Sequence, residues 1–212
     1  MISARTGAND MSDKGLLVVI SGYSGVGKGT VIQMVLDELP TLKFSVSCTT
    51  RAPRAGEENG VNYYFLSEEE FEKKIAENAF IEHTKTFTNY YGTLKSEIDT
   101  PVAAGVDILM ELNVVGAENI KKMYPDCVTI FVQPPSLEAL KARLIGRGSE
   151  SEESLARRLK EIENESKEIR KYDYIVTNCV ARTCAQEIVG IIKSEHLRSF
   201  RVLAKDIFSS EE

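Results

Sequence analysis

The sequence is short of several features that mark particular classes of protein. Its 212 residues include no tryptophan and only two histidines, and 26 basic side chains are outnumbered by 32 acidic ones. A formal net charge of −6 argues against a general nucleic-acid binder, because such proteins are typically basic over their binding face. We therefore expect no nucleic-acid partner, and any anion site must be local.

Long apolar runs and paired cysteines are also missing. The longest apolar runs, such as residues 16–20, are far below the roughly 20 residues that span a bilayer, so we expect no membrane partner. The polar residues 1–13 are unlike a secretory signal and predict a disordered tail. Four cysteines without a CxxC pair disfavour disulfides and zinc, and favour a cytoplasmic protein with free thiols.

Strand and helix patterns alternate along most of the chain. Residues 16–20 predict a strand buried on both faces, and apolar residues at helical spacing follow Lys28 as far as Pro40. The alternation continues with strands over 106–112, 128–132 and 174–176, and with helices over 117–123, 136–144, 153–170 and from about 183. Such alternation predicts an α/β fold with a parallel sheet core flanked by helices. The length suits one compact domain.

Residues 44–91 break this alternation. The pattern predicts short strands over 44–48, 63–66 and 79–81, with a helix that begins at Ser67 and carries a capping box through Glu70. We interpret the segment as a small, mostly β insertion over the carboxyl edge of the sheet, where open α/β proteins bind ligands.

A glycine-rich motif, G-x-x-x-x-G-K, runs from Gly22 to Lys28 between the first predicted strand and helix. In that context backbone N–H groups, the helix N-terminus and the lysine bind nucleotide phosphates, although an ordinary glycine turn is the alternative. Gly29 replaces the expected hydroxyl residue that contacts Mg²⁺, so the metal ligand stays unassigned. We expect Mg²⁺ to bind through phosphates and waters, with Thr30 as a candidate ligand. The predicted ATP phosphate site comprises Gly22, Tyr23, Ser24, Gly25, Val26, Gly27, Lys28, Gly29 and Thr30.

Two arginines three residues apart, Arg51 and Arg54, follow the strand predicted over 44–48. Guanidinium groups match phosphate oxygens in bidentate geometry, so the pair favours a second phosphate site. Other motifs accompany the pair, namely Tyr63, the run Phe80-Ile81-Glu82-His83 and the run Asn89-Tyr90-Tyr91-Gly92-Thr93.

With these motifs in this order, the chain from about Gly15 to its last helix resembles the guanylate kinase family. The resemblance implies a P-loop kinase with a GMP-binding insertion and a mobile helical lid, which transfers the γ-phosphoryl group of ATP to GMP in purine nucleotide metabolism and GMP recycling. By the same resemblance the GMP phosphate is held by Arg51, Arg54, Tyr63 and Tyr91, and guanine is read by Ser47, Glu82 and Thr93. A carboxylate such as Glu82 can accept from the ring N–H and the exocyclic amine of guanine, a donor pair that adenine lacks. Without the flanking motifs, Glu82 would be the exposed end of a strand.

The chain departs from the family where an acidic D-x-D motif is usual. It has Glu111 and Asn113 there, near the acceptor nucleotide and magnesium in the family. We keep both residues among the GMP-binding candidates and expect the reaction to be retained, with base recognition or metal affinity changed.

Basic residues around a Gly-Ser turn match the family's lid. Arg143, Arg147 and Arg158 match the arginines that close over the transferred phosphoryl group, and with Lys28 they are the predicted catalytic residues. Asn178 matches an asparagine beside the adenine of ATP. The expected division is into tails at 1–14 and 208–212, core at 15–43, 94–142 and 159–207, GMP-binding region at 44–93 and lid at 143–158.

Two rival functions stay open. A scaffold-type domain of this family would bind phosphopeptides without catalysis, but the intact phosphate loop disfavours it. A kinase for another monophosphate is disfavoured by Ser47, Glu82 and Thr93. We expect a monomer or homodimer.

Overall fold

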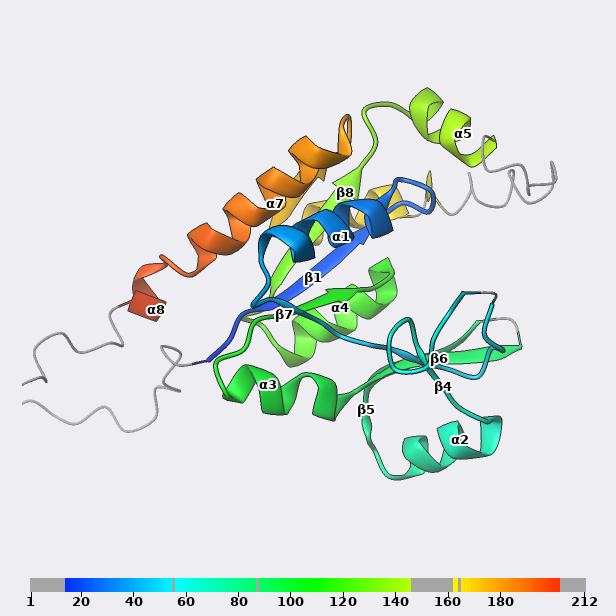
Figure 1. The fold of residues 1–212 in the computed structure, drawn as a ribbon. Coiled ribbons are helices and arrows are strands. Elements are labelled where there is room, and N and C mark those ends of the chain that lie inside the picture. Colours follow the sequence, from blue (N-terminus) through cyan, green and yellow to red (C-terminus); the bar gives the residue numbers. More distant parts are fainter. Residues whose placement is uncertain (1–13, 55, 87, 146–161, 164, 203–212) are drawn as a thin grey trace, which may run out of the picture.

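The computed structural model describes residues 14–54, 56–86, 88–145, 162–163 and 165–202. At its centre is a parallel sheet of five strands in the order β2-β7-β1-β8-β9 (Figure 1). These strands are Lys43–Phe44, Ile108–Glu111, Leu17–Gly22, Val128–Gln133 and Tyr174–Thr177. The prediction of an α/β fold with a parallel core is confirmed.

Both faces of β1 are covered, as its continuous apolar sequence predicts. Val18 and Ile20 lie in a core cluster with residues of α1 (Lys28–Glu38) and α7 (Ala181–Glu195). Leu17 and Val19 point to the other face, into a cluster with α3 (Asp99–Ala103) and α4 (Val114–Met123). Successive side chains of a strand alternate between faces, so a strand between two helical layers needs apolar residues at every position.

A second sheet of four strands, in the order β4-β3-β6-β5, holds the predicted insertion. Its strands are Tyr64–Phe65, Cys48–Thr49, Asn89–Leu94 and Phe80–Thr86. Helix α2 (Glu68–Ala76) covers it through the buried Phe71, which stacks on Phe80 and Tyr90. The capping box between Ser67 and Glu70 is confirmed, with both reciprocal hydrogen bonds present.

The structure corrects two predicted elements and adds a strand that was not predicted. The strand expected over 44–48 is two strands, because Phe44 pairs with the core sheet through β7 whereas Cys48 pairs within the second sheet. The strand β6 was not predicted, since it is mixed in polarity and its pairing with β5 forms it. Helix α4 begins at Val114 rather than at 117, because Asn113 caps it.

The remaining helices extend from the same core. Helix α5 (Leu137–Ile145) follows β8 and buries Leu140 and Leu144. Short helices lie at Lys95–Glu97, Ile169–Lys171 and Ser199–Val202. Most of the helix predicted over 153–170 lies outside the described residues. In the described ranges, no helix is both long and apolar enough to cross a membrane.

Candidate active site

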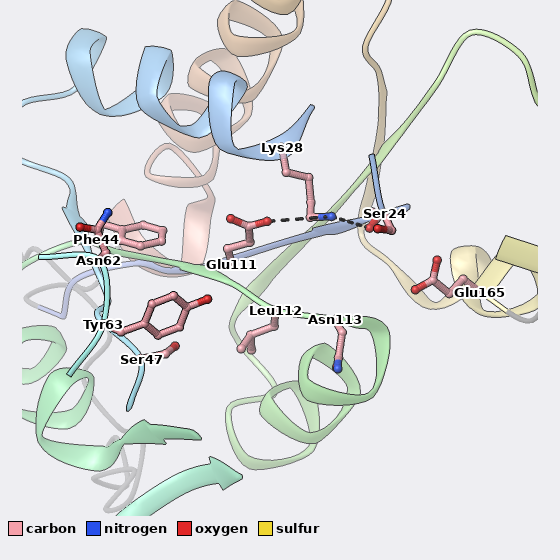
Figure 2. Close-up of a pocket in the computed structure, with 11 residues that line it drawn as sticks. Ser24, Lys28, Phe44, Ser47, Asn62, Tyr63, Glu111, Leu112, Asn113 and Glu165 are labelled. Carbon is pink, nitrogen blue, oxygen red and sulfur yellow. Dashed lines mark hydrogen bonds and ion pairs between the residues drawn. The ribbon is translucent and has the colours of Figure 1, made fainter. Parts of the chain in front are cut away.

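A cleft of about 330 Å³ lies where the carboxyl ends of β1 and β7 face the second sheet (Figure 2). Open α/β sheets bind ligands at this edge. Seven of the predicted site residues line it, namely Gly22, Ser24, Lys28, Ser47, Tyr63, Glu111 and Asn113. Phe44, Asn62, Leu112 and Glu165 complete the lining.

Glycine is required in the loop that joins β1 to α1. Gly27, at the N-cap of α1, has φ +99°, and a Cβ there would lie 2.9 Å from Nδ2 of Asn178. Gly25 has φ +83°, and its Cβ would approach Leu144 to 2.5 Å. Only glycine adopts such conformations without strain, so the loop shape depends on both residues.

The Lys28 side chain lies back along this loop. Its Nζ donates to the carbonyl oxygens of Gly22 (2.7 Å) and Tyr23 (3.2 Å) and lies 3.9 Å from a carboxylate oxygen of Glu111. The ammonium group is therefore held at the mouth of the loop and inside the cleft (Figure 2). Glu111, predicted as a GMP-binding residue, lies beside the lysine.

Two side chains support the loop from behind. Arg143 donates to the carbonyls of Val26 and Asn178, each at 2.9 Å, and the Asn178 side chain donates to the Val26 carbonyl at 2.9 Å. Asn178 is 4% exposed. Two donors on one carbonyl fix the orientation of the peptide after Val26, so both residues stabilise the shape of the loop.

Three residues predicted to read guanine form one hydrogen-bonded chain. The Thr93 hydroxyl donates to Glu82 Oε1, and it lies 3.1 Å from the Ser47 hydroxyl. Because a hydroxyl has one hydrogen, Ser47 is the donor to Thr93. Burial raises the pKa of Glu82, which the hydrogen bonds from Thr93 partly offset. The chain connects Glu82 to the cleft through Ser47.

The two predicted phosphate arginines differ in their surroundings. Arg51 makes a bidentate ion pair with Glu57, both N···O distances being 2.9 Å, and also donates to the Ala52 carbonyl. The hydrogen bond to Glu57 raises the pKa of Arg51, and the same bond lowers that of Glu57. Arg54 is exposed, and its backbone N–H donates to Glu57. Glu57 thus orders the whole turn.

The two predicted phosphate tyrosines lie next to Arg51. The Tyr63 ring is 6.3 Å from that of Tyr91, and the Arg51 guanidinium is 5.5 Å from the Tyr63 ring. Burial raises the pKa of Tyr63, and Glu111 adds to the effect. Tyr63 lines the cleft, so the Arg51 cluster reaches it through this ring.

Asn113 both lines the cleft and caps a helix. Its Oδ1 accepts from the Gly116 backbone N–H (2.8 Å) and caps α4. The side chain that lines the cleft therefore also uses its oxygen to cap the helix.

The structure does not bring every predicted residue to the cleft. Thr30 and Gly29 are exposed on the first turn of α1 and do not line it. Arg147 and Arg158 lie outside the described residues. Over the described ranges, no group of three or more His, Cys, Asp and Glu residues could hold a metal ion.

Sequence reasoning missed Glu57, Glu165 and the wall residues Phe44, Asn62 and Leu112. Glu57 had a signal, since it follows Arg54 by three residues in a turn. Glu165 comes from a segment that is distant in sequence from the phosphate loop, and nothing local indicates its place.

Comparisons with known proteins agree with this geometry. A family model described as guanylate kinase matches residues 14–195. The guanylate kinase of Symbiobacterium thermophilum is 45% identical over 188 residues, covering 89% of each chain. That of Clostridioides difficile is 48% identical over 182 residues, covering 86% of this chain and 89% of the other. The crystal structure of guanylate kinase from Anaplasma phagocytophilum superposes with a TM-score of 0.73 at 30% identity, covering 91% and 92% of the two chains.

Proposed function

The chain belongs to the guanylate kinase family and transfers the γ-phosphoryl group of ATP to GMP, and from that premise we propose that the cleft beside Lys28 is where the transfer takes place. The observation that carries the proposal is the position of the cleft. It has the phosphate loop on one wall and Ser47, which begins the hydrogen-bonded chain to Glu82, on another. The two nucleotides would thus meet end to end.

ATP would place its phosphates on the loop from Gly22 to Thr30. Backbone N–H groups at the start of α1 and the Lys28 ammonium supply positive charge there. Phosphate oxygens are stronger acceptors than the carbonyls of Gly22 and Tyr23, so we expect Lys28 to leave those carbonyls when ATP binds. Asn178 would lie beside the adenine.

GMP would bind on the side of the second sheet. Ionised Glu82 can accept both guanine donors, while Ser47 and Thr93 orient it. The phosphate would lie against Arg51, Arg54, Tyr63 and Tyr91. Arg51 uses three of its five N–H groups on Ala52 and Glu57 in the described residues, so at most two are left for a phosphate.

Direct in-line transfer needs no general base in this site. The second pKa of a phosphate monoester is about 6, so the attacking GMP oxygen is largely ionised at neutral pH. Catalysis then depends on alignment and on positive charge around the transferred group. Among the described residues, Lys28 supplies positive charge to this group. Arg147 and Arg158 stay predictions, and Arg143 would act by holding the loop that carries Lys28.

Mg²⁺ fits this cleft as an ion carried by ATP. Glu111 and Ser24 line the cleft with oxygen atoms of the kind that Mg²⁺ prefers, and Glu111 lies next to Lys28. We propose that these residues contact the ion through its waters, while Thr30 stays a candidate. Bound Mg²⁺ would neutralise charge on the phosphate oxygens.

The proposal is tested by ADP release with Mg²⁺-ATP and each of GMP, dGMP, AMP, UMP and dTMP. We expect turnover on GMP, a loss of at least about 100-fold in Lys28→Ala, and unchanged turnover in Lys122→Ala, which removes an exposed lysine on α4. The AMP rate reports how well Glu82 rejects adenine. Full activity in Lys28→Ala would contradict the proposed donor site. Tight GMP or phosphopeptide binding without turnover would favour the scaffold-type domain.

A further inference from the structure

Tyr23 is a large aromatic residue in a phosphate loop of mostly small ones. Its side chain is 7% exposed and packs edge-on against Phe131 of β8, with ring centroids 5.0 Å apart. Phe131 is fully buried and makes a second edge contact with Tyr172 at 5.1 Å. The Tyr23 ring therefore ties the loop to the strand next to β1 through a rigid aromatic contact.

The Tyr23 hydroxyl makes a second, more distant tie. It lies 2.9 Å from the Ser166 hydroxyl, 143 residues later in the chain. Ser166 donates its one hydrogen to the Ile162 carbonyl at 2.7 Å, so Tyr23 is the donor to Ser166. The bond joins the phosphate loop to the helical residues 165–168.

The backbone of Tyr23 belongs to the part of the loop that holds Lys28. Its carbonyl accepts from Lys28 Nζ and from the Val26 N–H, both at 3.2 Å. Any rotation of the Tyr23 peptide would move that carbonyl, and the Lys28 ammonium group that it binds would move too. Glu165, next to Ser166 in sequence, lines the same cleft as Lys28 (Figure 2).

We propose that Tyr23 is a positioning residue, whose contacts with Ser166 and Phe131 hold the peptide beside Lys28 and so set the affinity of the loop for the phosphates of ATP. The inference rests on the proposed placement of ATP on this loop. It also assigns Ser166 a role: its bond to Tyr23 holds the segment that carries Glu165 at a fixed position relative to the loop. Neither role requires contact with a nucleotide.

Two substitutions separate the hydroxyl from the ring. Tyr23→Phe keeps the edge contact with Phe131, and Ser166 keeps its bond to Ile162, so a single hydrogen bond is lost. Ser166→Ala leaves the Tyr23 hydroxyl without the acceptor described above. We expect the Kd for ATP to rise about three- to tenfold in each, which is the range for one hydrogen bond. The double variant should lose no more ATP affinity than Ser166→Ala alone. Ser166→Thr keeps a hydroxyl at this position and should bind ATP as the wild type does.

Calorimetry with ATP alone and GMP alone is the decisive measurement, because a general loss of structure would affect both Kd values. We expect the Kd for GMP to stay within about twofold, and the KM for ATP to rise more than kcat falls. Tyr174→Phe is the matched control. It removes a tyrosine hydroxyl bonded to Glu195 at the C-terminal end of α7, and should leave both Kd values unchanged.

Unchanged ATP affinity in both Tyr23→Phe and Ser166→Ala would overturn the inference, and so would equal losses for ATP and GMP. Additive losses in the double variant would overturn it too, because the two residues would then act separately. Lys28→Ala measured beside them distinguishes a different failure. If it binds ATP normally, the proposed ATP placement is wrong, whatever the behaviour of Tyr23.

Discussion

The carboxyl group of Glu82 lies within the second sheet, where the Thr93 hydroxyl donates to it at 3.1 Å. Burial raises the pKa of this group because desolvation disfavours its charge. When the pKa of a carboxyl is higher in the folded state than its ordinary value, the protonated group stabilises the folded state at pH values below the ordinary pKa. The contribution is lost as the pH rises through the folded pKa. At neutral pH the ionised group therefore destabilises the ligand-free protein, and guanine would supply the missing donors.

Glu82→Gln should separate binding from stability. We expect kcat/KM for GMP to fall at least about 100-fold, because an amide offers a donor where guanine presents donors. The unfolding temperature at pH 7.5 should be equal to that of the wild type or higher. Thermal melting and ADP release measure the two effects. Glu68→Gln, at an exposed carboxylate paired with Lys85, should change neither, and a lower melting temperature in Glu82→Gln would contradict the argument.

Asn113 allows a test in which the fold is held constant. Asparagine and aspartate are equally good helix caps, so Asn113→Asp should keep the bond to the Gly116 N–H and change the free energy of unfolding by less than about 0.5 kcal/mol. The change replaces an amide with a carboxylate on the cleft wall. The second carboxylate oxygen can accept from the N–H groups of guanine, so we expect a several-fold lower KM for GMP, measured over a GMP titration at saturating ATP. Kinetic constants identical to the wild type would show that this position does not influence the acceptor.

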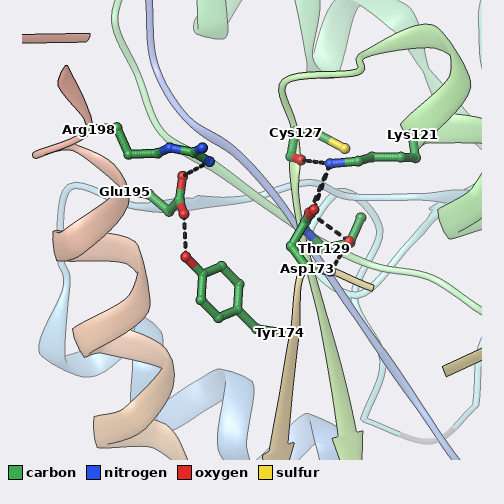
Figure 3. Close-up of polar contacts among 7 residues, drawn as sticks. All are labelled: Lys121, Cys127, Thr129, Asp173, Tyr174, Glu195 and Arg198. Carbon is green, nitrogen blue, oxygen red and sulfur yellow. Dashed lines mark hydrogen bonds and ion pairs between the residues drawn. The ribbon is translucent and has the colours of Figure 1, made fainter. Parts of the chain in front are cut away.

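At the level of elements, polar contacts tie the edge strand β9 to its neighbours (Figure 3). Asp173, immediately before β9, accepts from Lys121 of α4 at 2.8 Å and from the backbone and hydroxyl of Thr129 in β8, each at 2.8 Å. One residue later, Tyr174 donates to Glu195 of α7. Burial alone would raise the pKa of Asp173, but the bonds from Lys121 and Thr129 outweigh it and lower the pKa.

Asp173→Asn should destabilise the protein by about 1 kcal/mol at neutral pH, a value reduced for the partial exposure of the pair. A lowered pKa means that the stabilisation is present above the ordinary value and is lost as the pH falls through the folded one. The difference from the wild type should thus shrink below about pH 4. Urea unfolding between pH 3 and 8 measures it, with Asp37→Asn on α1 as the control. A difference independent of pH would contradict the assignment.

At the level of the whole molecule, the net charge opposes anionic ligands, and positive groups lie on two walls of the cleft beside the carboxylates of Glu111 and Glu165. The chain has a formal charge of −6, and both substrates are anions. The cleft gathers Lys28 and the start of α1 at one wall, and Arg51 lies behind Tyr63 at the other. Binding should therefore join the two sheets through the nucleotides, because each supplies one wall.

Each nucleotide should consequently stabilise the native protein separately. A ligand at 100 times its Kd adds about 2.7 kcal/mol, which for a chain of this size corresponds to roughly 5–10 °C in melting temperature. We expect GMP alone and Mg²⁺-ATP alone each to raise the melting temperature, and Lys28→Ala to lose the ATP effect while it keeps the GMP effect. No shift with GMP at any concentration would contradict a preformed acceptor site.

Much of the fold could be predicted from local patterns. The unbroken apolar sequence of β1 requires two covered faces, and Ser67 with Glu70 is enough to begin α2. Strand β6 was missed, because its residues alternate poorly and its stability comes from pairing with β5. The strand predicted over 44–48 was divided for a similar reason, since two different sheets offer partners to its ends.

The sequence by itself determined the position of the phosphate loop in the chain. Its glycine conformations and the start of α1 depend on residues that are close in sequence. It also determined the resemblance that pairs this loop with a GMP site. Only the tertiary structure decided how the pieces act on one another: Glu57 ordering Arg51, Arg143 supporting Val26, and Tyr23 reaching Ser166. Each of these contacts depends on the distance and angle between two groups rather than on a sequence period. A buried donor forms its hydrogen bond with whichever acceptor the folded chain brings within about 3 Å.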